Sequence, residues 1–129
     1  HHLSALTKQK VLGVYAEKSD GPEGFVLKRG YDALVRGKKI LVVEDVLNTG
    51  GSVKKVVDVV RKTGGTVAAV AALCNRGAVT AEALGGVPRL FSLVNLEMDA
   101  FDAQGCPLCA KGVAINTAVG KGREFLARS

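Results

Sequence analysis

Histidine, cysteine and aromatic residues are scarce in this chain of 129 residues. The two histidines are the first two residues, so we propose no Ser-His-Asp catalytic arrangement. Three cysteines are an odd number, which rules out a full set of internal disulfides and favours a reduced, cytoplasmic chain. Two Tyr and four Phe offer few stacking surfaces, and the basic residues are scattered, so nucleic-acid binding is not expected as the main role.

Long apolar runs are also missing. No run approaches the roughly 18–20 residues of a membrane-spanning helix, and the chain opens with His1-His2-Leu3-Ser4-Ala5 rather than with a charged-then-apolar leader. The composition, 47% apolar and 23% charged, is ordinary for a globular protein, and the length predicts a single domain over 1–129. The net charge of +6 suits an anionic ligand.

Strand-like and helix-like segments alternate along the chain, which predicts an α/β fold with a mostly parallel sheet flanked by helices. The run 40–43 is β-branched and does not alternate with polar residues, so we expect a central strand buried on both faces. From Ser52 onward, valines recur at helical spacing until Gly64 and Gly65, which predict the helix end. Further strands are predicted at 11–15, 66–73 and 90–93, a short helix at 80–84 and a last helical turn near Gly122.

The most informative segment is 39–52, which reads Lys-Ile-Leu-Val-Val-Glu-Asp-Val-Leu-Asn-Thr-Gly-Gly-Ser. An apolar run ends in two adjacent carboxylates, Glu44 and Asp45, and a turn of small residues precedes the helix. Such a turn lets backbone N–H groups converge at a helix N-terminus, where they can bind phosphate. Because carboxylates accept hydrogen bonds from sugar hydroxyls, the segment predicts a receptor for a sugar phosphate. The alternative is an acidic pair at a strand end followed by an ordinary serine helix cap.

This segment resembles the binding motif for 5-phosphoribosyl-1-pyrophosphate (PRPP) in type I phosphoribosyltransferases, and in detail that of the orotate phosphoribosyltransferases. The family pattern is an apolar strand, two acidic residues, two further residues and a Thr-Thr-Gly-Gly-Ser-like loop. Asn48 stands where Thr or Ala is more usual, which changes one side chain and leaves the backbone cradle intact. The resemblance implies a type I phosphoribosyltransferase-like fold and transfer of the phosphoribosyl group from PRPP to orotate, giving orotidine 5'-monophosphate and pyrophosphate.

The resemblance also implies roles for individual residues. Glu44 and Asp45 would accept hydrogen bonds from the ribose hydroxyls, and the backbone of 48–52 would bind the 5-phosphate, with added contacts from the hydroxyls of Thr49 and Ser52. Mg²⁺ is implied as the partner of PRPP, held by the pyrophosphate and the ribose hydroxyls with the two acids nearby. The candidate substrate-binding residues are Glu44, Asp45, Val46, Leu47, Asn48, Thr49, Gly50, Gly51, Ser52 and Arg76, and the candidate catalytic residues are Lys18 and Asp45.

Lys18 and Arg76 come from the resemblance alone. Residues 17–21 lie where orotate enzymes carry a mobile catalytic loop rich in Lys and His, and Lys18 is the best local match for its cation. This loop has few basic residues and no His, so Lys28 and Arg29 are candidates to supply the missing positive charge. The alternative for Lys18 is an ordinary solvated lysine in a surface loop. Arg76 stands where orotate enzymes place an arginine over the pyrimidine, which its planar guanidinium could engage; an ordinary arginine at a strand exit is the alternative.

Relative to the family, an upstream strand and a pyrophosphate-binding loop are missing. We therefore expect N-terminal truncation within the first core helix, with His1 and His2 as its remnant or as part of a purification tag. Orotate enzymes tend to be homodimers, which makes a homodimer the expectation. Two other functions stay open, namely transfer to another base and PRPP sensing without catalysis.

Cys106-Pro107-Leu108-Cys109 lies in a Gly-containing tail over 106–129 and permits three interpretations. The pair could be two structural cysteines in a turn. It could supply half of a zinc site, with Cys74 as a third ligand and His1 or His2 as a fourth, and so build a zinc-dependent interaction module. It could also be redox-active.

Overall fold

The computed structural model describes residues 1–99, 101–120, 122 and 126–127. The chain divides into two compact units, His1–Met98 and Asp99–Ser129, which are described separately. The single domain over 1–129 stays a prediction. The helical turn predicted near Gly122 falls largely on positions 121 and 123–125, which lie outside the described residues.

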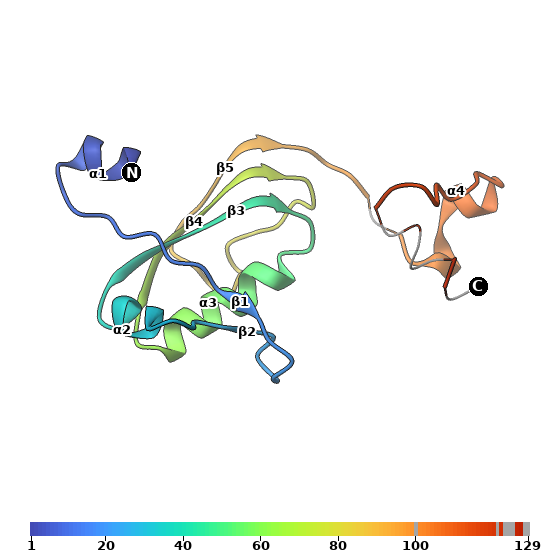
Figure 1. Cartoon of the computed structure of the whole chain (residues 1–129). Helices are drawn as coiled ribbons and strands as arrows, with labels where there is room; N and C mark the ends of the chain where they lie inside the picture. The colour runs from blue at the N-terminus through green and yellow to red at the C-terminus, as the bar shows by residue number, and fades with distance from the viewer. Residues whose placement is uncertain (100, 121, 123–125, 128–129) are drawn as a thin grey trace. The chain divides into compact units, whose positions relative to one another are not determined.

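The first unit is an α/β structure, as predicted (Figure 1). Its elements are α1 (His2–Thr7), β1 (Glu17–Lys18), β2 (Phe25–Val26), α2 (Tyr31–Val35), β3 (Lys39–Leu47), α3 (Gly51–Lys62), β4 (Thr66–Asn75) and β5 (Leu90–Asn95). Strands β1 and β2 pair antiparallel, and β3, β4 and β5 form a parallel sheet in that order. The second unit contains the 3-10 turn η1 (Ala103–Gly105) and the short helix α4 (Pro107–Ala110). Among the described residues, every helix is too short or too polar to cross a membrane.

The predicted βαβ unit is present as β3, α3 and β4. Helix α3 buries a stripe of valines against the sheet and leaves its lysines exposed. The helix stops where Gly64 takes a φ of 88° and Gly65 packs on Val35; a Cβ at position 65 would lie 2.8 Å from the Val35 Cγ1. The core comprises Val35, Val42, Leu47, Val53, Val57, Val60, Val67, Val70, Ala72, Val79, Leu84 and Val87.

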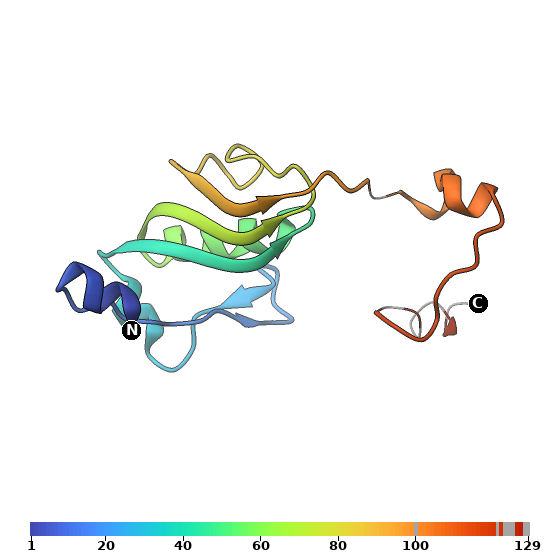
Figure 2. The same cartoon turned by 90° about the horizontal axis from the view of Figure 1, so that it is seen from above.

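The prediction of a central strand buried on both faces is wrong. Strand β4 lies in the middle of the described sheet and β3 lies at its edge. Exposure alternates along β3, since Val42 is 7% exposed and Val43 is 69% exposed. Helix α3 covers one face of the sheet (Figure 2), and on β4 Leu73 is left 60% exposed. The apolar run indicated a strand, but only the placement of the helices decides how many of its faces are covered.

Two other predicted elements also differ. Residues 11–15 form no strand, and pairing begins only at Glu17, which lies opposite Val26. An apolar run becomes a strand only where a partner accepts its backbone hydrogen bonds. The predicted helix at 80–84 is a series of turns, in which Thr80 Oγ1 accepts a hydrogen bond from the Ala83 N–H at 3.3 Å.

Candidate functional site

The loop between β3 and α3 consists of Asn48, Thr49 and Gly50. Gly50 is buried and has a φ of 74°, a conformation that favours glycine. A Cβ at position 50 would lie 2.8 Å from the Val79 Cγ1 and 2.9 Å from the Leu84 Cδ2. Position 50 therefore requires glycine both for its backbone angle and for its space.

The N-terminus of α3 presents backbone donors without intrahelical acceptors. The first helical hydrogen bond runs from the Lys54 N–H to the Gly50 carbonyl at 2.8 Å, so the N–H groups of Gly51, Ser52 and Val53 precede it. Among the described residues none provides a side-chain cap, and the Gly51 N–H reaches Thr49 Oγ1 only at 3.4 Å. Free N–H groups together with the dipole of a twelve-residue helix attract an anion.

A polar hollow of about 290 Å³ opens at this helix end. The residues that line it are Glu44, Val46, Leu47, Asn48, Thr49, Gly50, Gly51, Ser52 and Val53. The structure thus brings together all the predicted substrate-binding residues except Asp45 and Arg76. Val53 was missed, although its place in the first helical turn could have indicated it.

The two acids lie inside β3 rather than at its end. The strand continues to Leu47, which pairs with Asn75 of β4, so the expectation that it stops at the acids is wrong. Successive strand residues face opposite ways, and accordingly Glu44 lines the hollow whereas Asp45 does not. The Asp45 carboxylate accepts a hydrogen bond from the Val46 N–H at 2.6 Å.

The end of β4 and the residues that follow it make hydrogen bonds next to the loop 48–50. The Arg76 N–H donates to the Leu47 carbonyl at 2.9 Å. The buried Asn75 side chain donates to the Val79 carbonyl at 2.9 Å and accepts from the Val79 N–H at 3.0 Å. The Arg76 side chain is exposed and does not line the hollow. The sequence analysis missed the role of Asn75, for which a polar residue ending an apolar strand was the available signal.

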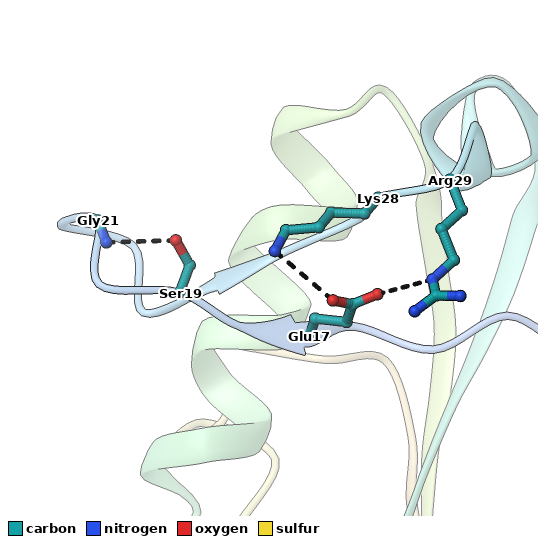
Figure 3. Close-up of polar contacts among 5 residues, drawn as sticks. All are labelled: Glu17, Ser19, Gly21, Lys28 and Arg29. Carbon is teal, nitrogen blue, oxygen red and sulfur yellow. Dashed lines mark hydrogen bonds and ion pairs between the residues drawn. The ribbon is translucent and has the colours of Figure 1, made fainter.

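The hairpin formed by β1 and β2 carries the predicted catalytic loop (Figure 3). Its carboxylate Glu17 accepts a hydrogen bond from the Arg29 Nε at 3.0 Å and lies 3.5 Å from the Lys28 Nζ. The hydrogen bond from Arg29 is the main cause that lowers the pKa of Glu17. Both candidate cations are therefore paired with Glu17. Lys18 is exposed, and none of the ion pairs found among the described residues involves it.

A larger hollow of about 460 Å³ lies between the hairpin turn and α3. Two of the three cations that line it already have partners, because Lys62 pairs with Glu23 at 2.5 Å and the Arg61 Nη1 donates to the Gly85 carbonyl at 2.6 Å. Mixed and neutralised charge makes it a poorer anion site than the smaller hollow.

As to metals, the residues that the structure describes contain no group of three or more His, Cys, Asp or Glu able to hold an ion. The zinc interpretation of Cys106 and Cys109 thus lacks an assembled ligand set there.

The family model described as "Phosphoribosyl transferase domain" matches residues 10–107. The chain is 39% identical over 102 residues to an orotate phosphoribosyltransferase of Caldicellulosiruptor bescii, covering 79% of this chain and 50% of that protein. It is 39% identical over 105 residues to one of Chlorobium phaeobacteroides, covering 80% of this chain and 50% of that protein. The chain therefore spans about half the length of these curated relatives.

Among solved structures, the chain is similar to an orotate phosphoribosyltransferase of Mycobacterium tuberculosis in complex with inorganic phosphate. The identity is 39%, the TM-score is 0.44, and the match covers 48% of this chain and 38% of that chain.

Proposed function

The chain belongs to the phosphoribosyl transferase domain family, and on this premise we propose that it binds PRPP in the hollow at the start of α3. We further propose that it transfers the phosphoribosyl group to orotate, releasing pyrophosphate. The observation that carries the proposal is one hollow in which free N–H groups of a helix N-terminus and the carboxylate Glu44 are combined.

The two ends of this hollow have different chemistry. The N–H groups of Gly51, Ser52 and Val53 hold the 5-phosphate, and the exposed hydroxyls of Thr49 and Ser52 add hydrogen bonds. Glu44, on the wall formed by β3, accepts hydrogen bonds from the ribose hydroxyls. A sugar held at both ends presents its C1 in a fixed position, which lowers the entropic barrier to attack by a base. Asp45 lies outside the hollow, and its ribose-binding and catalytic roles stay predictions.

The residues present fit a magnesium ion carried by the substrate. A carboxylate beside a phosphate site suits Mg²⁺, which prefers substrate phosphates plus one or two carboxylates, and Glu44 is that carboxylate. When bound, the ion would neutralise charge on the departing pyrophosphate. Glu44 would orient the ribose hydroxyls close to it.

Orotate as the acceptor is supported by the names of the relatives, each of which is an orotate phosphoribosyltransferase. Arg76 is the residue of this chain proposed to engage the base. Its backbone N–H donates to the carbonyl of Leu47, which lines the hollow. The backbone of Arg76 therefore lies beside the hollow, and its side chain is exposed. A homodimer belongs to the same proposal, and sedimentation of the chain tests it.

Binding of PRPP without transfer is a second candidate, favoured by the hairpin. Lys28 and Arg29 are paired with Glu17, so each would have to leave that ion pair to approach a leaving pyrophosphate. A protein of this kind would sense PRPP and catalyse nothing.

Calorimetric titration with PRPP and Mg²⁺ tests the binding site first. We expect micromolar affinity, about −8 kcal/mol, that is lost in Glu44→Gln. The matched control is Glu82→Gln, which makes the same charge change at an exposed residue away from the hollow. Equal affinity in both variants would refute the site.

Turnover then separates the two candidate functions. Release of pyrophosphate with orotate, and not with adenine, supports the orotate enzyme. Release with adenine instead supports a transferase for another base. Binding of PRPP with no release for any base supports the sensor.

A further inference from the structure

The motif Cys106-Pro107-Leu108-Cys109 has no part in the proposed function. It lies in the second unit, where Cys106 is the N-cap of α4 and Pro107 is the first helical residue. Both cysteines are free thiols; Cys109 is exposed and Cys106 is partly exposed. Two accessible thiols separated by two residues form a cluster of nucleophilic groups that needs a separate explanation.

The turn is fixed by backbone hydrogen bonds. The Ala110 N–H donates to the Cys106 carbonyl at 3.1 Å, and the Lys111 N–H donates to the Leu108 carbonyl at 3.2 Å. Proline at the first helical position restricts the backbone further. Side chains three residues apart on a helical turn are neighbours, with Cβ atoms about 5–6 Å apart. A disulfide requires Cβ atoms about 3.5–4.5 Å apart, so the turn must bring the two Cβ atoms roughly 1–2 Å closer to join the sulfurs.

The two thiols are not equivalent. The nearby backbone N–H of Cys109, aided by the Cys109 thiol and the Leu108 backbone, lowers the pKa of Cys106, and within the part of the chain that the structure describes the Cys106 sulfur makes no helix-cap hydrogen bond. The pKa of Cys109 is raised, chiefly because its thiol donates to Cys106. Cys106 is therefore the sulfur that ionises first, and Cys109 holds its proton.

We propose that Cys106 and Cys109 form a reversible dithiol–disulfide pair that exchanges with small-molecule disulfides. The Cys106 thiolate attacks one sulfur of the small disulfide, which breaks the S–S bond and expels one thiolate. Cys109 then loses its proton and attacks the Cys106 sulfur of the mixed disulfide, expelling the second thiolate. The protein dithiol is oxidised to a disulfide, and one small disulfide is reduced to two thiols.

Oxidised glutathione is the probe, used on the full chain in the presence of a metal chelator. The Cys74→Ser variant leaves only the two motif thiols and is the background for every measurement. In that background we expect intact mass spectrometry to show the loss of two hydrogens and no glutathione adduct. Adding Cys109→Ser should trap one glutathione on Cys106. Adding Cys106→Ser should give an adduct on Cys109 more slowly, because Cys109 lacks the nearby backbone N–H that lowers the pKa of Cys106.

The converse variant checks the specificity of the pair. A chain with Cys106 and Cys109 both replaced by serine retains Cys74 and should show only a single glutathione adduct, without loss of hydrogens. Three outcomes would overturn the proposal. They are stable separate adducts on both motif thiols, a disulfide that links two chains, and zinc in the untreated protein that protects both thiols until the chelator is added. None of these readouts depends on PRPP binding, so failure here is distinct from failure of the proposed function.

Discussion

Gly77 lies so close to Asn48 that a Cβ at position 77 would overlap the Asn48 carbonyl oxygen. The two residues are far apart in sequence, one after β3 and one after β4, and the parallel pairing of these strands brings them together. The loop 48–50 therefore rests on the backbone of the segment 76–79. Its shape depends on a glycine outside the motif that identified it.

Gly77→Ala is expected to displace this loop. Backbone cannot move away as easily as a flexible side chain, so we expect a loss of stability of about 1–3 kcal/mol or more and weaker binding of PRPP. Denaturant melts and calorimetry measure the two effects. Gly13→Ala is the control, since a Cβ there meets nothing within 4 Å, and it should match the wild type in both.

The two motif glycines are expected to respond differently. Gly50→Ala combines a positive φ with overlap on Val79 and Leu84, and should cost at least about 2 kcal/mol of folding free energy. Gly51→Ala should fold normally, because its Cβ would meet only the Thr49 Oγ1 at 3.6 Å. Thermal unfolding of the two variants side by side decides this, and equal destabilisation would contradict the assigned backbone geometry.

Asn75→Ala is expected to leave the Val79 N–H and carbonyl without their buried partner. Unsatisfied buried polar groups cost about 1–3 kcal/mol. Asn95→Ala removes an amide that is bonded only at the surface, to the Ser92 hydroxyl, and should change stability by less than about 0.5 kcal/mol. Urea denaturation compares the two, and similar costs would show that Asn75 does not hold the loop.

The hairpin is expected to weaken in acid. The hydrogen bond from Arg29, aided by the charge of Lys28, lowers the pKa of Glu17 in the folded state. A carboxyl with a depressed folded pKa stabilises the fold above its unfolded value, about 4.3 for Glu, and loses that contribution as pH falls through the lower folded value.

The Glu17 carboxyl carbon, followed by NMR against pH, measures this titration. Its midpoint should lie below the ordinary Glu value in the wild type and rise toward it in Arg29→Gln. Arg89→Gln, which changes an exposed arginine outside the hairpin, should leave the midpoint unmoved. A midpoint insensitive to Arg29 would contradict the assigned partner.

The two faces of β4 are expected to differ in their tolerance of polar residues. Leu73→Thr, at a side chain that is 60% exposed, should cost little. Val70→Thr, at a side chain that is 0% exposed, should cost about 1–3 kcal/mol because it buries a hydroxyl. Denaturation midpoints measure both, and an equally large cost at Leu73 would show that this face is covered in solution.

Local patterns predicted the elements whose signals are local. The helix α3 and its end at Gly64 and Gly65 follow from valine spacing and from glycine backbone freedom, and both are present. The loop 48–50 and the N–H groups that follow it could also be predicted from local sequence, because they belong to consecutive residues. Residues 11–15 have the composition of a strand but form no strand. Strand formation depends on a pairing partner elsewhere in the chain, which local composition does not reveal.

The sequence by itself determined the family, the βαβ unit and most of the residues that line one hollow, namely Glu44 and the run from Val46 to Ser52. Only the tertiary structure decided that Glu44 faces this hollow while Asp45 does not, that Glu17 pairs with both Lys28 and Arg29, and that Gly77 and Asn75 support the loop. The physical reason is the range of the interactions. Capping and periodicity act over a few residues, whereas a strand's exposed face, an ion pair and a backbone contact depend on segments that meet only once the chain is folded.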